Sequence, residues 1–204
     1  MGVRDWLAPR LLDWMMRSVD DLRPETVSQA HGEVLEVGFG TARNLPHYQP
    51  AVRSVTGLDP MPTEGLAIVE QRIAQARFPV ERTVLRADGE LPFDAGRFDC
   101  VLTTWTLCSI PDPLAALSEM RRVLKPGGRY LFIEHGRSER ARTARWQDRL
   151  NPLWRGLTGG CNMDRRMDAL VEQGGFQLAS LDRFQAPGPS LLACMYRGVA
   201  TRER

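Results

Sequence analysis

Two glycines and a carboxylate follow apolar stretches of the chain at a spacing that bears on ligand binding. Gly38 and Gly40 come directly after the stretch 33–37, and Asp59, followed by Pro60, ends the next apolar stretch about twenty residues later. Glycine has no Cβ, so the backbone at these positions can come close to a ligand. A carboxylate after the second stretch can accept hydrogen bonds from both hydroxyls of a ribose. These residue types at this spacing predict a nucleoside site.

The glycine pattern lacks the member that a bound pyrophosphate would need. A dinucleotide fingerprint has a third glycine where Arg43 stands, because that glycine lets a helix pack close to the pyrophosphate. A nucleoside without phosphates has no such requirement, and S-adenosylmethionine is a ligand of this kind. We expect Glu36 to lie near the ammonium of its amino-acid tail or to order the turn. Asp88 and Gly89, which follow the apolar stretch 80–86, are then placed to contact the adenine.

Strands and helices must alternate along the chain to bring these residues to one edge of a sheet. The predicted strands cover 33–38, 52–58, 80–86, 98–104, 130–133, 176–184 and 191–199, and the predicted helices cover 42–48, 63–76, 112–124 and 163–173, with 138–157 helical or irregular. This order predicts an α/β fold with a doubly wound, Rossmann-like sheet of seven strands. The last two strands are joined too closely for parallel pairing. The sheet is therefore mixed, parallel except for one reversed strand near the C-terminus.

An ordered set of motifs then resembles a known family. The segments "VLEVGFGT", "GLDP", "ADGELPF", "FDCVLTTWTLCSI" and "EMRRVLKPGGRYLFIEH" resemble, in order, the motifs of class I S-adenosylmethionine-dependent methyltransferases. The resemblance covers about residues 32 to 135 and implies cofactor binding by the glycine turn, Asp59, and Asp88 with Gly89. Ala42 departs from the pattern, because many members have a third glycine there, and Phe39 stands where small residues are common.

A narrower resemblance extends toward the C-terminus. The segments "TLCSI", "EHGRS", "WQDRLNPLWRGLTGGCNMDR" and "FQAPGP…YRGVA" are similar to the methyltransferase-like thiol S-methyltransferases. This similarity implies a thiol as the methyl acceptor. The animal members are membrane-associated and carry a longer apolar N-terminal anchor, in place of which this chain has a shorter predicted helix over 3–22.

The end of the predicted strand 98–104 is expected to border the sulfonium and the acceptor. Thr104 can offer a backbone carbonyl to the cofactor ammonium, and Trp105 can form a wall of the site. A thiol must attack as its thiolate, and its pKa is ordinarily near 8.5, so a base or a cation has to help. His135, which follows the fifth strand, is the candidate catalytic base, since imidazole titrates near neutrality. We expect Cys108 to line the acceptor site as a small apolar side chain rather than to react.

Residues 136–162 form an insertion that is predicted to cover the acceptor. Trp146, Trp154, Cys161 and Asn162 are its candidate lining residues, and they would make a largely apolar pocket for a small hydrophobic molecule. The alternative is a second hydrophobic cluster without a role in substrate binding.

Composition limits the partners. The formal charge of +2 over 204 residues gives no basis for nucleic-acid binding. The four cysteines include no CxxC pair or zinc spacing, so no metal is predicted, and reduced thiols in a cytoplasm are the expectation. Residues 1–31 are predicted to be an amphipathic helix or lid ahead of the methyltransferase domain at 32–204. Balanced charge allows that helix only weak contact with a membrane surface, and the oligomeric state stays open.

Three functions follow from these features. The first is S-methylation of a small hydrophobic thiol. The second is methylation of a carbon, oxygen or nitrogen atom of a quinone-like or phospholipid acceptor. The third is a cofactor-binding module without turnover, which would need the nucleoside site but no acceptor pocket.

Overall fold

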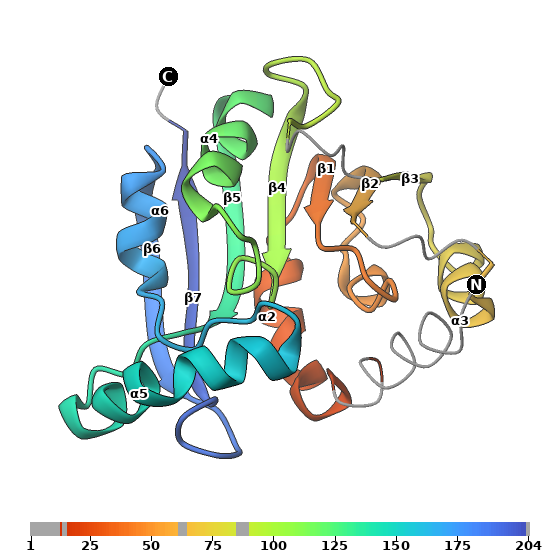
Figure 1. Ribbon diagram of the computed structural model, residues 1–204. Helices are drawn as coiled ribbons and strands as arrows, with labels where there is room; N and C mark the ends of the chain where they lie inside the picture. Colours follow the sequence, from red (N-terminus) through yellow and green to blue (C-terminus); the bar gives the residue numbers. More distant parts are fainter. Residues whose placement is uncertain (1–12, 14–15, 61–64, 85–89, 203–204) are drawn as a thin grey trace.

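The computed structural model describes residues 13, 16–60, 65–84 and 90–202, and these form one seven-stranded sheet with helices on both faces (Figure 1). The strands are β1 (Gly32–Val37), β2 (Val52–Asp59), β3 (Val80–Val84), β4 (Phe98–Thr104), β5 (Leu124–His135), β6 (Gln177–Gln185) and β7 (Cys194–Thr201). Their order across the sheet is β3-β2-β1-β4-β5-β7-β6. β7 pairs antiparallel with both β5 and β6, and the remaining pairs are parallel. The predicted mixed sheet with one reversed strand is confirmed.

Helices cover both faces of the sheet, as a doubly wound fold requires. They are η1 (Arg17–Leu22), α2 (Arg23–Val27), η2 (Leu45–His47), α3 (Ala67–Ala74), α4 (Pro113–Val123), α5 (Ala141–Thr158) and α6 (Met167–Gln173), the two η elements being 3-10 helices. On one face Leu117 of α4 and Val171 of α6 share a core cluster with Val101. On the other face Val27 of α2 packs in a cluster with Leu102. Val101 and Leu102 are neighbours on β4 and serve opposite faces, because successive side chains of a strand alternate.

Two predicted elements differ from the observed ones. The helix expected over 42–48 is only the 3-10 turn η2, because Ala42 has a left-handed φ of 62° that no right-handed helix accommodates. The strand expected over 130–133 is much longer and begins at Leu124, directly after α4 ends. Pro126, Gly127 and Gly128, residue types that ordinarily follow the end of a helix, lie inside β5, where Gly127 donates its N–H to the carbonyl of Arg202. Other boundaries shift by a few residues.

The N-terminal segment reaches the turn after β1. Most of the helix predicted over 3–22 lies outside the described residues, but Asp13 and η1 are described. Asp13 is buried and pairs with Arg43 and Arg72, and its Oδ1 accepts a hydrogen bond from Thr41. Burial alone would raise the pKa of Asp13. Hydrogen bonds from Arg72, Thr41 and Arg43 outweigh this effect and lower the pKa to about 2. The segment before the domain is therefore held by ion pairs against the predicted cofactor turn.

Candidate active site

The carboxyl ends of β1 and β2 are joined by hydrogen bonds. Gly38 donates its N–H to the carbonyl of Leu58 at 2.8 Å, and Gly40 donates its N–H to Oδ2 of Asp59 at 2.8 Å. The second bond orients the carboxylate that the sequence predicts for a ribose. Pro60 follows it and is exposed. Asp88 and Gly89, the predicted adenine contacts, lie outside the described residues, so their role stays a prediction.

The two glycines of the turn serve different purposes. Both have positive φ, 84° at Gly38 and 52° at Gly40, a conformation that glycine adopts without strain. A Cβ on Gly38 would lie 2.0 Å from Oγ1 of Thr106, so Gly38 allows the turn to pack against the end of β4. A Cβ on Gly40 would meet nothing nearer than the Gly38 carbonyl oxygen at 4.0 Å among the described residues. A side chain is therefore sterically excluded at Gly38 and not at Gly40.

Glu36 orders the turn through two hydrogen bonds. It is completely buried, and its carboxylate accepts from Asn44 Nδ2 at 2.9 Å and from the Tyr48 hydroxyl at 2.8 Å. Burial raises the pKa of Glu36 to about 7, against the lowering effect of these bonds. Of the two predictions for Glu36, the ordering of the turn is the one these contacts describe.

Arg23 is a site residue that the sequence did not single out. Its buried guanidinium donates from Nη1 to Asn44 Oδ1 at 2.8 Å and to Thr104 Oγ1 at 3.1 Å. Its Cζ lies 4.9 Å from the ring centroid of Trp105, within the range of a cation–π contact. Burial lowers the pKa of Arg23, but a guanidinium titrates so high that it stays charged. A fixed positive charge thus lies where β4 ends, and no motif around Arg23-Pro24 could have indicated it.

The chain turns sharply directly after β4. Trp105 has a φ of 52°, which is strained for a bulky residue and costs about 1–3 kcal/mol. The next residues are held by Glu134, a fully buried carboxylate that accepts N–H bonds from Thr106 and Leu107 at 3.0 Å and from Cys108 at 3.4 Å. Such strain persists where surrounding contacts fix it, and it is frequent at functional sites. Sequence reasoning missed Glu134, whose only signal was its place beside His135.

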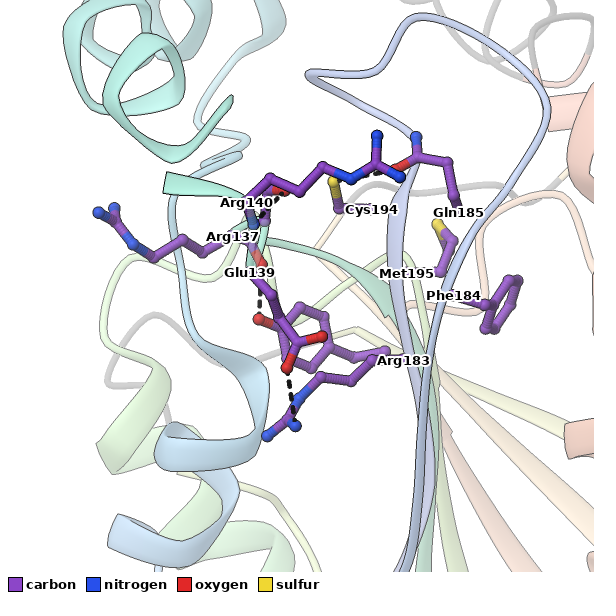
Figure 2. Close-up of a pocket in the computed structure, with 10 residues that line it drawn as sticks. Arg137, Glu139, Arg140, Arg183, Phe184, Gln185, Cys194 and Met195 are labelled. Carbon is purple, nitrogen blue, oxygen red and sulfur yellow. Dashed lines mark hydrogen bonds and ion pairs between the residues drawn. The ribbon is translucent and has the colours of Figure 1, made fainter. Parts of the chain in front are cut away.

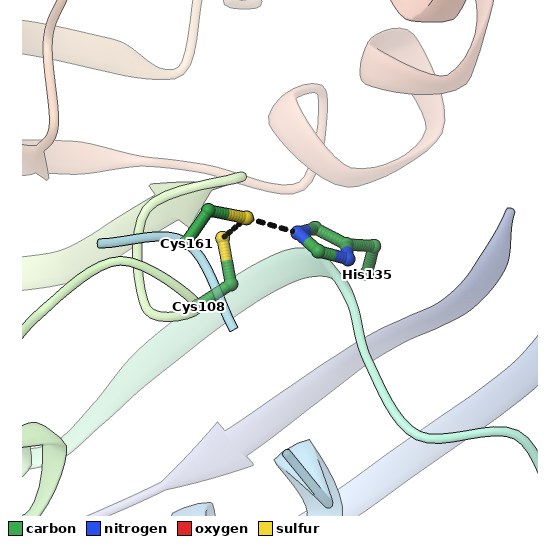
Figure 3. A group of neighbouring side chains, drawn as sticks. All are labelled: Cys108, His135 and Cys161. Atoms are coloured by element: carbon green, nitrogen blue, oxygen red, sulfur yellow. Dashed lines mark hydrogen bonds between the residues drawn. The ribbon is translucent and has the colours of Figure 1, made fainter. Parts of the chain in front are cut away.

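His135, Cys161 and Cys108 lie together, as Figure 3 shows. His135 Nε2 is 2.9 Å from Cys161 Sγ, and the two sulfurs are 3.9 Å apart. Hydrogen bonding with Cys108 and His135 lowers the pKa of Cys161, whereas the bond with Cys161, together with burial, raises the pKa of Cys108. Asn162 fixes this contact, because its backbone N and its Nδ2 both donate to the Cys108 carbonyl, at 2.9 and 3.0 Å. The predicted base and three predicted lining residues are thus brought together.

The two tryptophans of α5 lie differently. Trp154 is half-buried and is near enough to Cys161 to contribute to the lowering of its pKa. Trp146 is 48% exposed and stacks with Arg149 at 5.6 Å, while the buried face of α5 is formed by Ala144, Gln147 and Asn151. The structure therefore does not bring Trp146 to the cluster, and its predicted role in binding the acceptor has no support from its position.

A pocket of different character opens beyond the end of β5 (Figure 2). Its lining is Arg137, Ser138, Glu139, Arg140, Arg183, Phe184, Gln185, Cys194, Met195 and Tyr196. Three of its charged side chains form ion pairs: Arg137 with Asp148, and Arg183 with Glu139 and with Asp168. Sequence reasoning did not predict this pocket, whose lining mixes charged side chains with Phe184, Met195 and Tyr196 and contains none of the predicted acceptor residues.

The comparisons with known proteins identify a methyltransferase domain. The model of a methyltransferase domain family matches residues 35–132. The human thiol S-methyltransferase TMT1A is 35% identical over 156 residues, 76% of this chain and 64% of the relative. Human thiol S-methyltransferase TMT1B is 31% identical over 181 residues, 84% of this chain and 74% of the relative. The chain thus spans about two thirds to three quarters of the length of these two relatives.

Other matches show how widely the fold is shared. A phosphatidylethanolamine N-methyltransferase of Cereibacter sphaeroides is 34% identical over 110 residues, 53% of each chain. The solved structure of an S-adenosylmethionine-dependent methyltransferase from Methanosarcina mazei superimposes with a TM-score of 0.62 at 20% identity, covering 84% of this chain and 92% of that one. Fold, domain model and relatives lead to one assignment: the chain belongs to the class I S-adenosylmethionine-dependent methyltransferases and is an enzyme related to the thiol S-methyltransferases.

Proposed function

We propose that this enzyme binds S-adenosylmethionine at the edge formed by β1, β2 and β4 and methylates the sulfur of a small hydrophobic thiol. Three observations support the cofactor site. Gly40 has unfilled space beside its backbone, and Asp59 is oriented by the Gly40 N–H at the end of β2. Arg23 places a buried positive charge at the end of β4. Together these groups suit a ribose and a charged amino-acid tail.

Arg23 is the residue that would recognise the tail. Its Nε is paired with Asp20 at 3.0 Å and its Nη1 donates to Asn44 and Thr104, so among the bonds of the described residues Nη2 is the donor left for the cofactor carboxylate. Glu36 acts indirectly, because Asn44 accepts a bond from Arg23 and donates one to Glu36, which holds Asn44 in place. A tail with a carboxylate is complementary to this arrangement.

When bound, the cofactor supplies an electrophilic methyl group on a sulfonium, whose leaving group is neutral. The protein therefore needs no acid, and its task is to position the acceptor and exclude water. Trp105 suits this task, because its strained backbone and the Arg23 contact fix the ring at the end of β4. Glu134 holds the turn that continues to Cys108.

The observation that carries the thiol assignment is the contact between His135 and Cys161. An imidazole nitrogen lies 2.9 Å from a thiol sulfur at the carboxyl end of β5, next to the turn after β4. The enzyme thus has a group suited to receiving the proton of a thiol, which must be lost for attack. The names of the two human relatives point the same way.

A lipid acceptor is the second candidate. Trp146, Leu153 and Leu157 lie on one side of α5 by helical spacing and are exposed by 48%, 64% and 75%. The relative named phosphatidylethanolamine N-methyltransferase belongs to this alternative. Among the described residues no helix is both long and apolar enough to cross a bilayer. Contact of the N-terminal helix with a membrane surface and a cytoplasmic location stay proposals.

The test is transfer of a labelled methyl group from S-adenosylmethionine to a panel of alkyl and aryl thiols, phenols, quinols and phospholipid vesicles. We expect labelled thioether as the main product, and at least tenfold less of it from Asp59→Ala at a cofactor concentration below the dissociation constant. Transfer to phospholipid or quinol without thioether would overturn the thiol assignment. The exposed Asp94→Ala variant is the matched control for the loss of a carboxylate.

A further inference from the structure

Cys108, His135 and Cys161 come from three separate parts of the fold and converge on one point (Figure 3). Cys108 lies in the turn after β4, His135 ends β5, and Cys161 follows α5. Their two sulfurs and one imidazole nitrogen all lie within 4.8 Å of one another. Nothing in the linear spacing reveals this cluster, because its members are 27 and 26 positions apart and form no short zinc motif.

We propose that these three side chains bind one zinc-class divalent cation and leave a fourth coordination position for the sulfur of the acceptor. The acceptor part of this inference rests on the proposed thiol methylation, and the metal part does not. Two cysteines, one histidine and an open fourth position are a known ligand set of catalytic zinc. The two thiolates also balance the double charge of the ion.

The distances fit such an ion. With Zn–S near 2.3 Å and Zn–N near 2.1 Å, tetrahedral geometry puts two sulfurs about 3.8 Å apart and sulfur about 3.6 Å from nitrogen. The observed sulfur–sulfur distance is 3.9 Å. The observed distance from His135 Nε2 to Cys161 Sγ is 2.9 Å, so the imidazole must move outward by roughly 0.7 Å to reach the value of about 3.6 Å.

The orientation of the imidazole permits ligation. Nε2 is the imidazole nitrogen that faces the sulfurs, and Nδ1 is buried without a hydrogen-bond partner among the described residues. A proton on Nδ1 leaves the lone pair of Nε2 free for a metal. Two bonds from Asn162 to the Cys108 carbonyl hold the loop of Cys161 in place before any ion binds.

The ion would promote loss of the acceptor thiol's proton, which is the role that the sequence assigns to His135 as a base. Loading releases the two cysteine protons to solvent, and coordination of the acceptor thiol releases one more. After the acceptor thiol loses its proton, a lone pair on its sulfur forms the new carbon–sulfur bond. The sulfonium carbon–sulfur bond breaks, and its electron pair stays on the departing thioether. No redox change occurs, so no oxidant or reductant is required.

The experiment measures metal binding without relying on turnover. The reduced full-length protein is stripped with chelator and titrated with Zn²⁺ and, separately, with Co²⁺. We expect one ion per chain, a rise in melting temperature on Zn²⁺ binding, and a thiolate-to-cobalt charge-transfer band. Cys161→Ser should weaken Zn²⁺ binding at least tenfold, and Cys194→Ser should not, because Cys194 hydrogen-bonds Gln185 and the Ser190 carbonyl instead. Cys108→Ser tests the second sulfur in the same way. If that variant does not fold, the cobalt spectrum of the unaltered protein still reports sulfur ligation.

Several results would overturn the metal site. One is the absence of Zn²⁺ binding under reducing conditions. Another is equal Zn²⁺ binding by Cys161→Ser and Cys194→Ser. A third is a Cys108–Cys161 disulfide that forms in air in a protein that binds no metal when reduced. Addition of 2-mercaptoethanol should shift the cobalt band, and an unshifted band would remove the acceptor from the fourth position. Thiol methylation by metal-free protein would leave the proposed function standing while this inference fails. Metal binding without any thioether product would leave the metal site standing while the proposed function fails.

Discussion

The backbone N–H of Gly40 and Oδ2 of Asp59 are 2.8 Å apart, which joins the turn after β1 to the end of β2. Hydrogen bonds to a charged acceptor contribute about 1.5–3 kcal/mol. Asp59 therefore both orders the turn and, in our proposal, binds the ribose, so its removal affects the site twice.

Asp59→Ala is expected to weaken S-adenosylmethionine binding by about 10- to 100-fold, because a charge-assisted bond is worth about 1.5–3 kcal/mol. Isothermal titration calorimetry measures this change directly. Asp94→Ala, which removes an exposed carboxylate, should bind like the parent. Unchanged affinity in Asp59→Ala would place the ribose elsewhere.

Arg23→Gln tests recognition of the amino-acid tail. The variant removes the charge beside Thr104 and Trp105 but leaves the Gly40–Asp59 unit intact. We expect at least tenfold weaker binding of S-adenosylhomocysteine, which carries the tail, and little change for methylthioadenosine, which lacks it. The ratio of the two dissociation constants separates tail recognition from general loss of structure. Equal weakening for both ligands would mean that Arg23 is only structural.

The fold was predictable from the sequence because its signals are local. The apolar stretch 98–104 predicts β4 with the observed bounds. The short connection between the last two strands requires them to pair antiparallel. The errors arose where the backbone departs from regular patterns. The left-handed conformation of Ala42 shortened a helix, and β5 continues through Gly127, a residue type that ordinarily ends elements.

The site was predictable only where one segment carries it. Gly38, Gly40 and Asp59 could be identified from a motif, whereas Arg23 contacts Thr104 from 81 positions away. The meeting of Cys108 with Cys161 spans 53 positions. Such contacts depend on the packing of α2 and of the loop after α5, and no spacing in one sequence encodes them.

Glu36 should make stability fall as pH rises through neutrality. Its pKa is raised to about 7 in the folded protein, from 4.5, so the folded state holds a proton that the unfolded state has lost. The stabilisation is complete below about pH 4.5 and is lost as the pH approaches 7. It amounts to at most about 3 kcal/mol, at about 1.4 kcal/mol per unit.

Chemical denaturation at pH 5 and pH 8 checks this expectation. In Glu36→Gln the difference in unfolding free energy between the two pH values should shrink, since the amide has no proton to lose. Glu33→Gln, on the same strand and half-exposed, is the control. An equal pH dependence in the parent and in Glu36→Gln would show that the carboxyl titrates in its ordinary range.

Ala42 tests whether the turn keeps its left-handed conformation without the third glycine. Its φ of 62° costs alanine about 1 kcal/mol, and its buried methyl group returns a similar amount. Ala42→Gly should therefore change the unfolding free energy by less than about 1 kcal/mol. Ala42→Val should cost more than about 2 kcal/mol, because a β-branched residue is a severe outlier at positive φ and the added methyl groups would enter a fully buried position.

Urea denaturation of both variants provides the measurement, with Ala30→Gly as the control. Ala30 is equally buried but is not among the described residues with positive φ, so its replacement loses a methyl group and gains no relief of strain. Ala30→Gly should thus destabilise the enzyme clearly more than Ala42→Gly does. If the two glycine variants lose the same stability, the backbone at Ala42 carries no strain that glycine relieves.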